Sequence, residues 1–134
     1  MKKVVYGTVL LLFFVFSGCL MAAESDGEEG TLKHALLMKT GQDLVDLCSV
    51  TPADPLHDRA IAFCYGFVSG AMSFYGAIAD SPKVPKIVCS EEMIPRSDMV
   101  GAFLVWSGKN PEYLSEAPID VLVRSAMAQW PCEK

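Results

Sequence analysis

The chain has 134 residues, of which 51% are hydrophobic and 20% charged, and its formal net charge is −5. This length allows one domain with a modest core. The excess of Asp and Glu over Lys and Arg argues against a nucleic-acid-binding protein, because phosphate backbones select clusters of basic residues. An acidic surface of this kind fits solubility or a basic protein partner.

The N-terminus, MKKVVYGTVLLLFFVFSGC, has the three parts of a secretory signal. Lys2 and Lys3 form a basic segment, residues 9–16 form an apolar run, and small residues follow. The run is too short for a membrane span, which needs about 20 residues. We therefore expect an exported protein that loses residues 1–23. The mature chain of 111 residues then has a net charge of −7, because two lysines leave with the signal.

Two routes of processing are open. The segment FSGC, residues 16–19, is similar to a bacterial lipobox, in which Cys19 is lipidated and becomes the new N-terminus, although Phe16 stands where leucine is expected. The alternative is a plain cut after Ala23, with Met21 in place of the usual small residue. The first route gives a lipoprotein anchored at Cys19, and the second gives a soluble protein.

The mature domain keeps four cysteines, Cys48, Cys64, Cys89 and Cys132. An even number of cysteines in a small exported chain predicts two disulfides. A zinc site would need closely spaced ligand pairs, and the sequence has none, so no metal is expected. A nucleophilic thiol would need a base, for which His57 lies nine residues after Cys48. An oxidising compartment would consume such a thiol, which favours the bridges.

Residues 24–39 begin with the acidic stretch ESDGEEGT and are predicted to form a flexible leader. If Cys19 is lipidated, this leader becomes a tether to the membrane. Residues 40–134 are expected to form a single helical domain, since they show no internal repeat or second boundary.

The first two helices of the domain are predicted over residues 41–48 and from about residue 57 to 80. Thr40 caps the first, with Asp43 three residues on as an acidic variant of the capping box. The second contains twenty uncharged residues, AIAFCYGFVSGAMSFYGAIA, which is long enough to span a membrane. Its glycines, serines and lack of leucine favour instead a central helix buried in a small bundle.

The C-terminal half is predicted to contain a loop and two further helices. Residues 81–95 hold three prolines and form a long ordered loop. Ser97 caps a helix over about residues 97–108, Asn110 opens a short turn, and Pro118 opens the last helix. That last helix carries apolar residues at the i, i+3, i+4 spacing of a buried stripe: Ile119, Leu122, Val123, Ala126, Met127 and Trp130.

This order of elements favours one pairing of the cysteines. A Cys48–Cys64 bridge would pin the first helical hairpin, and a Cys89–Cys132 bridge would close the C-terminal half. In the chain-entropy model they are worth about 3 and about 4 kcal/mol. Two crossed pairings remain open.

An ordered set of short motifs resembles a known family. The set comprises LVDLC at residues 44–48, FCYGFVSG at 63–70, Cys89, NPE at 110–112, LVRSA at 122–126 and WPC at 130–132. It resembles the periplasmic immunity proteins against type VI secretion amidases, also called resistance-associated proteins, over residues 40–132. Trp130 stands where phenylalanine is expected. The resemblance implies an all-α bundle of about four helices stapled by disulfides and similar in shape to acid-stress periplasmic chaperones. It also implies a periplasmic location and a homodimer.

The implied activity is stoichiometric inhibition rather than catalysis. The protein would dock on a peptidoglycan-cleaving amidase delivered by neighbouring cells and occlude its Cys-His active site. The chain's own histidines, His34 in the leader and His57 at a helix start, have no accompanying nucleophile motif, so no enzymatic activity or cofactor is expected. The alternative function is an envelope-stress, chaperone-like lipoprotein that binds unfolded clients.

The candidate contact residues lie on the loop over residues 81–95, which a rigid helical body would present to the groove of the effector. They are Lys83, Lys86, Glu91 and Glu92. The expected partners are the amidase effector and a second copy of the chain. We expect no nucleic acid, and contact with a membrane only through a lipid at Cys19.

Overall fold

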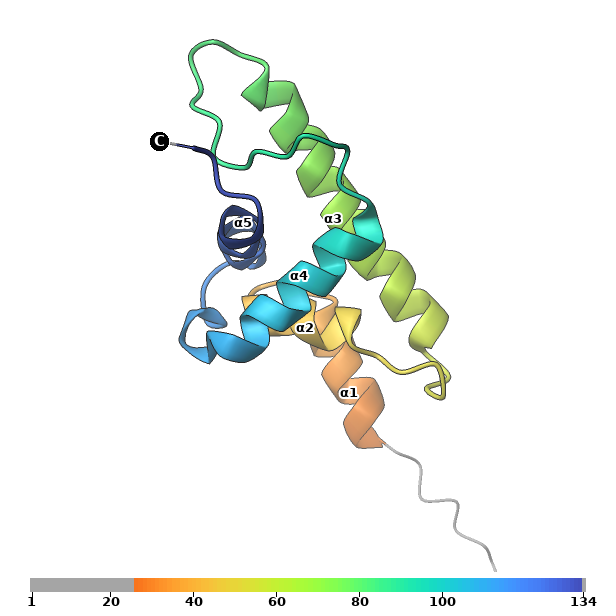
Figure 1. Ribbon diagram of the computed structural model, residues 1–134. Helices are drawn as coiled ribbons and strands as arrows, with labels where there is room; N and C mark the ends of the chain where they lie inside the picture. The colour runs from red at the N-terminus through yellow and green to blue at the C-terminus, as the bar shows by residue number, and fades with distance from the viewer. Residues whose placement is uncertain (1–25, 134) are drawn as a thin grey trace, which may run out of the picture.

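The computed structural model describes residues 26–133. The predicted signal peptide and the lipidation at Cys19 lie outside these residues. Five α-helices and one 3-10 helix make up the described chain, and this part contains no strand (Figure 1). The elements are α1 (Asp26–Ala35), α2 (Gly41–Cys48), α3 (His57–Ala79), α4 (Arg96–Lys109), η1 (Pro111–Tyr113) and α5 (Pro118–Gln129). The all-α, disulfide-stapled fold predicted from the sequence is confirmed.

Helix α1 adds a fifth helix to the predicted four and lies where the acidic composition predicts a flexible leader. Its later residues place Leu32, Ala35 and Leu36 at the i, i+3, i+4 spacing of an apolar stripe. Ala35 is 1% exposed and belongs to the core cluster, and the two leucines pack against that cluster. The stripe therefore docks α1 on α2, despite the acidic residues at its start.

Helix α2 begins with the capping box that the sequence predicts. The Thr40 hydroxyl accepts a hydrogen bond from the Asp43 amide at 3.3 Å. One carboxylate oxygen of Asp43 accepts in return from the amides of Lys39 and Thr40, both at 2.9 Å. These bonds satisfy amides that a helix start leaves without partners, so the start of α2 is fixed by its own sequence.

The core lies where α2 packs against α4, α5 and the first half of α3. Leu44, Phe103 and Val121 are fully buried there and come from three different helices. Gly41 allows α2 and α5 to approach closely, because a Cβ at this position would collide with the Val121 side chain. Backbone bonds from Gly41 and Gln42 to carbonyls after η1 reinforce the same contact.

Helix α3 differs from its prediction as a central, buried helix. Only Ala60, Cys64 and Val68 are buried, and all three lie in its first half. The reason is length: 23 residues extend about 34 Å, whereas the eight residues of α2 extend about 12 Å. The second half of α3 therefore projects beyond the other helices (Figure 1). Within the described residues, α3 alone is long and apolar enough to span a membrane by length and composition.

Helix α4 begins at Arg96, with Pro95 in the N-cap position. The prediction of Ser97 as the cap is therefore wrong, because the preceding proline sets the helix start. The Ser97 hydroxyl donates instead to the Asp98 carboxylate at 3.0 Å. Helix α5 begins at Pro118, as predicted.

Two disulfides join Cys48 to Cys64 and Cys89 to Cys132, which is the pairing that the predicted element order favours. The first links the end of α2 to α3, and both of its cysteines are buried in the core. The second links the loop after α3 to the segment after α5 and lies nearer the surface.

Candidate partner-binding site

The segment between α3 and α4, residues 80–95, is irregular and lies at the projecting end of α3 (Figure 1). We call it the charged loop. It begins with a turn in which the Ser81 amide donates to the Ile78 carbonyl at 3.0 Å and the Val84 amide donates to the Ser81 carbonyl at 3.1 Å. Three prolines exclude a continuous helix here, as the sequence predicts.

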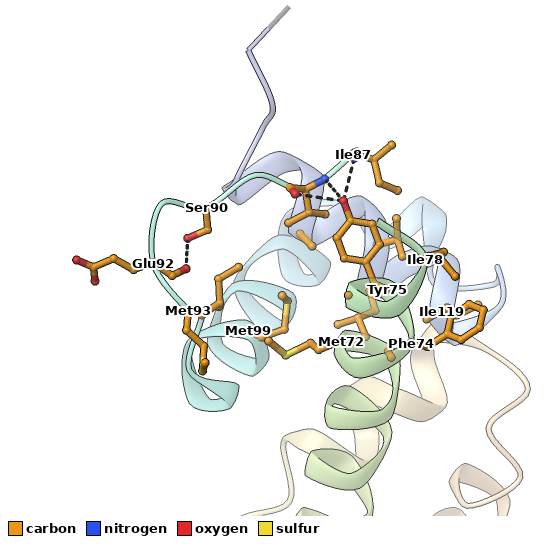
Figure 2. Close-up of a pocket in the computed structure, with 17 residues that line it drawn as sticks. Met72, Phe74, Tyr75, Ile78, Ile87, Ser90, Glu92, Met93, Met99 and Ile119 are labelled. Carbon is orange, nitrogen blue, oxygen red and sulfur yellow. Dashed lines mark hydrogen bonds between the residues drawn. The ribbon is translucent and has the colours of Figure 1, made fainter. Parts of the chain in front are cut away.

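Tyr75 fixes the middle of the charged loop. Its hydroxyl accepts hydrogen bonds from the amides of Ile87 and Val88, each at 3.0 Å, and donates to the Val88 carbonyl at 3.2 Å (Figure 2). One side chain of α3 thereby satisfies three backbone groups of a segment without secondary structure. The sequence pattern does not reveal this role, because the partners of Tyr75 are backbone atoms rather than residues of a recognisable type.

The second disulfide fixes the next residue of the loop. Cys89 is bonded to Cys132, and its amide donates to the Trp130 carbonyl at 2.9 Å. Residues 87–89 are therefore held at two adjacent points, by α3 on one side and by the chain after α5 on the other. A loop held in this way loses little conformational freedom when a partner binds.

The four predicted contact residues lie on the two limbs of the charged loop, on either side of this fixed segment. Lys83 and Lys86 precede it, whereas Glu91 and Glu92 follow it. All four are exposed, and none of them forms an ion pair within residues 26–133. The structure thus brings them to one loop, with a basic limb and an acidic limb, rather than to one cluster. The Ser90 hydroxyl shapes the acidic limb by donating to the Glu92 carbonyl at 2.6 Å.

A concave apolar surface lies beside the charged loop. Its cavity has a volume of about 480 Å³ and is bounded by the second half of α3, loop residues 87–94, the start of α4 and helix α5. We call it the α3–α5 groove. Representative lining residues are Met72, Phe74, Ile78, Met93, Met99 and Ile119 (Figure 2). The sequence did not predict the groove. An apolar helix is predicted to be buried, and the sequence does not show whether another part of the chain covers it.

The two histidines of the described chain make structural contacts away from this surface. His57, at the other end of α3, has its Nδ1 at 2.8 Å from the Val50 carbonyl oxygen. His34, in α1, has its Nδ1 at 3.3 Å from an Asp43 carboxylate oxygen. Within residues 26–133 no group of three or more His, Cys, Asp or Glu side chains has the arrangement of a metal site.

Asp43 is the acidic group whose titration the fold alters. Its burial raises the pKa, but the backbone hydrogen bonds from Thr40 and Lys39 together with the nearby His34 outweigh that effect. The pKa of Asp43 therefore lies below its ordinary value of 3.8. This carboxylate stabilises the junction of α1 and α2 and lies outside the candidate binding surface.

Comparison with known proteins gives one match. The family model described as Rap1a immunity proteins matches residues 40–132, from the cap of α2 to the second cysteine of the surface disulfide. The matched region contains both disulfides, the charged loop and the α3–α5 groove, whereas α1 precedes it. No curated protein matches the chain, and no solved structure does.

Proposed function

Because this chain belongs to the Rap1a immunity protein family, the family of immunity proteins against type VI secretion amidases, we propose that it binds one such amidase and covers its active site. The family assigns it the role of an immunity protein against a secreted effector. In our proposal the inhibition is steric: a rigid surface fills the substrate cleft of the effector, and no group of the inhibitor takes part in chemistry.

The order of the charged loop is the observation that supports this proposal most directly. Tyr75 and the Cys89–Cys132 bridge fix the loop, yet its four predicted contact side chains are exposed and form no ion pair in the described chain. A surface that is already ordered binds with a smaller entropic cost. Unpaired charges of both signs can complement charges at the rim of a cleft, which raises the association rate and selects the partner.

The proposed location is the periplasm, where such an amidase would reach its substrate. The two disulfides support export, because bridges of this kind persist in oxidising compartments. The N-terminal sequence supports a signal peptide, with either a lipid at Cys19 or a cut after Ala23. Mass spectrometry of the mature N-terminus distinguishes the two products, because a lipidated Cys19 adds the mass of acyl chains.

We also propose that two copies associate through the exposed face of α3. Phe63 is 40% exposed there, and Gly66 and Gly70 lie on the same face at i+3 and i+7. A Cβ at either glycine would meet nothing within 4 Å, so a second helix has room to approach.

Gly70→Leu should convert a dimer to a monomer in light scattering, whereas the matched Gly108→Leu on α4 should not. A wild-type monomer at micromolar concentration would contradict this part of the proposal.

The test of the inhibitory function is a titration of amidase activity. A type VI secretion amidase from the same organism is incubated with peptidoglycan and increasing amounts of the oxidised protein. We expect activity to reach zero near one inhibitor per effector. Full activity in the presence of excess protein would contradict the proposal.

A pair of charge-neutral variants locates the contact within that assay. The first replaces the four contact residues of the charged loop by alanine, namely Lys83, Lys86, Glu91 and Glu92. The control replaces two exposed acids and two exposed bases elsewhere, namely Asp58, Arg59, Lys109 and Glu112. We expect the loop variant to need about tenfold more protein for the same inhibition and the control to behave as wild type. Equal inhibition by the two variants would remove the loop from the interface.

A further inference from the structure

Several exposed apolar side chains line the α3–α5 groove. Phe74 is 68% exposed, Met93 is 92% exposed and Ile119 is 41% exposed, and all three line the same cavity (Figure 2). They come from α3, the charged loop and α5, so three separate parts of the chain present them together. Single exposed apolar residues are ordinary, but a set of them around a concavity is typical of an interaction site.

The two hydroxyl groups of the lining are already hydrogen-bonded within the chain. The Tyr75 hydroxyl makes its three hydrogen bonds to the loop backbone, and the Ser90 hydroxyl donates to the Glu92 carbonyl. The groove therefore offers apolar contact without a free hydroxyl to orient a polar ligand. Whatever part of an occupant enters the groove must itself be apolar.

The shape and composition of the groove fit the side chains of a peptide. Its volume of about 480 Å³ lies within the range of roughly 300–1,000 Å³ found for binding pockets. Met72, Met93 and Met99 line it, and methionine adapts its conformation to side chains of different shapes. Helices α3 and α5 form two of its walls, which is the arrangement of a groove that receives an amphipathic helix.

The charges around the groove select the sign of the occupant. Four exposed acids neighbour its lining: Asp80 follows α3, Glu91 and Glu92 belong to the loop, and Asp120 adjoins Ile119 in α5. None of these acids forms an ion pair within the described residues. Figure 2 shows the Glu92 carboxylate directed outward, away from the apolar floor.

At the start of α4 an exposed base, Arg96, is offset by an exposed acid, Asp98. Arg124, beside Val123, is ion-paired with Glu116. The remaining exposed bases, Lys83 and Lys86, lie on the other limb of the loop, so the acids exceed the bases near the groove. This excess favours a cationic occupant and disfavours the anionic head group of a fatty acid or a phospholipid.

We propose that the α3–α5 groove binds one basic, amphipathic helical segment of a protein partner. The apolar face of that segment would enter the groove at positions i, i+3 or i+4, and i+7, and its lysines or arginines would pair with the acidic limb of the loop. The groove is thus a second contact surface beside the tip of the charged loop. The proposal does not require the partner to be an amidase.

The test uses the oxidised full-length secreted chain and a designed 18-residue peptide of leucine and lysine with one apolar helical face. Binding is followed by fluorescence anisotropy of the labelled peptide. We expect saturable one-to-one binding that weakens with added salt and raises the helical content of the peptide. A leucine and glutamate peptide of the same pattern, and lauric acid, should bind at least about tenfold more weakly, since charge selects the occupant.

Matched variants assign the binding to the groove. Phe74→Lys and Met93→Lys alter exposed side chains, so the fold should persist, and both should weaken binding of the leucine and lysine peptide about tenfold or more. Val105→Lys makes the same change at a 60% exposed position of α4 outside the groove and should leave the affinity within about twofold. Circular dichroism checks that all three variants are folded.

Three results would overturn the proposal. The first is an equal loss of affinity in Val105→Lys and Phe74→Lys. The second is binding of the acidic peptide or lauric acid as tight as that of the basic peptide. The third is Phe74-dependent binding of a reduced, unfolded client protein with the same affinity, which would assign the groove to unfolded chains. None of these results bears on the amidase titration, so this proposal and the inhibitory function can fail separately.

Discussion

The two halves of α3 have environments opposite to their compositions. The half that begins with charged residues, Asp58 and Arg59, is the one that contributes to the core, whereas the half without charged residues is uncovered. The first half contributes Ala60, Cys64 and Val68 to the core and is bonded to α2 through a buried disulfide. The second half buries none of its residues, carries the exposed Phe74 and supports the charged loop through Tyr75. The comparison shows that an apolar sequence sets neither core nor surface by itself. The lengths of the neighbouring helices decide which half is covered.

This division separates stability from binding. Residues near the first half of α3 should govern unfolding. Exposed side chains near the second half, apart from the Cys89–Cys132 bridge, should govern partner affinity with little effect on unfolding.

The largest difference in stability between the two regions is expected when one phenylalanine in each is replaced by alanine. Phe103 is fully buried in α4, and Phe103→Ala should lower the free energy of unfolding by about 3–5 kcal/mol because it leaves a cavity. Phe74→Ala removes a side chain that is 68% exposed and should change it by no more than about 0.5 kcal/mol. Urea denaturation of the oxidised proteins measures both. A decrease of more than about 2 kcal/mol in the free energy of unfolding of Phe74→Ala would exceed what a surface substitution usually causes. It would indicate that the second half of α3 is covered in solution.

The disulfides give the next contrast. Loss of Cys89–Cys132 by double alanine substitution should cost about 4 kcal/mol and loss of Cys48–Cys64 about 3 kcal/mol, because they close loops with separations of 43 and 16 residues. Hydrogen exchange separates the two further. Only the variant without Cys89–Cys132 should speed exchange of the Ile87 and Val88 amides relative to global unfolding, since the loop then loses its covalent link to the chain after α5. Faster exchange there in the Cys48–Cys64 variant would contradict the division.

Alanine substitution at two glycines compares a tightly packed position with an open one. Gly41→Ala should destabilise the fold by about 1–3 kcal/mol, because the added methyl collides with Val121. Gly101→Ala, in α4, meets nothing within 4 Å and should stabilise the fold by up to about 1 kcal/mol through higher helix propensity. Thermal unfolding of both variants gives the signs. A destabilising Gly101→Ala would mean that a neighbour already occupies that face of α4.

The smallest effect concerns the pH dependence of the α1–α2 junction. The lowered pKa of Asp43 means that its carboxylate contributes stability above the unfolded value of 3.8, which is lost as the pH falls through the folded pKa. Asp43→Asn should therefore cost roughly 1 kcal/mol at neutral pH and nothing once Asp43 is protonated in the native state. Urea midpoints across this pH range, with Asp46→Asn as the control, measure the difference. A constant cost at all pH values would show that the charge is irrelevant.

Local signals in the sequence predicted the parts of the fold that depend on neighbouring residues in the chain. Thr40 and Asp43 mark the start of α2, and Pro118 marks the start of α5, because caps and prolines act within one helical turn. The order of the helices also favoured the disulfide pairing that the structure shows. The start of α4 was misplaced by two residues, because Pro95 rather than Ser97 occupies the cap.

Features that depend on distant contacts could not be predicted in this way. Helix α1 is stabilised by the burial of Ala35 in a core that other helices supply. The acidic residues at its start do not show this contact, and they predicted a flexible leader. The charged loop was predicted from its prolines, and four of its charged residues were named as contact residues. Their separation into a basic and an acidic limb follows from the points at which Tyr75 and Cys132 hold the segment between them.

The most direct test of the account is the affinity of the effector amidase for a protein whose loop is no longer held in place. Calorimetry compares the oxidised wild type with the Cys89→Ala, Cys132→Ala double variant, under conditions where both are folded. If the ordered surface at the second half of α3 performs the binding, the variant should bind about tenfold more weakly, with a larger entropic penalty. Equal affinity of the two proteins would contradict the account.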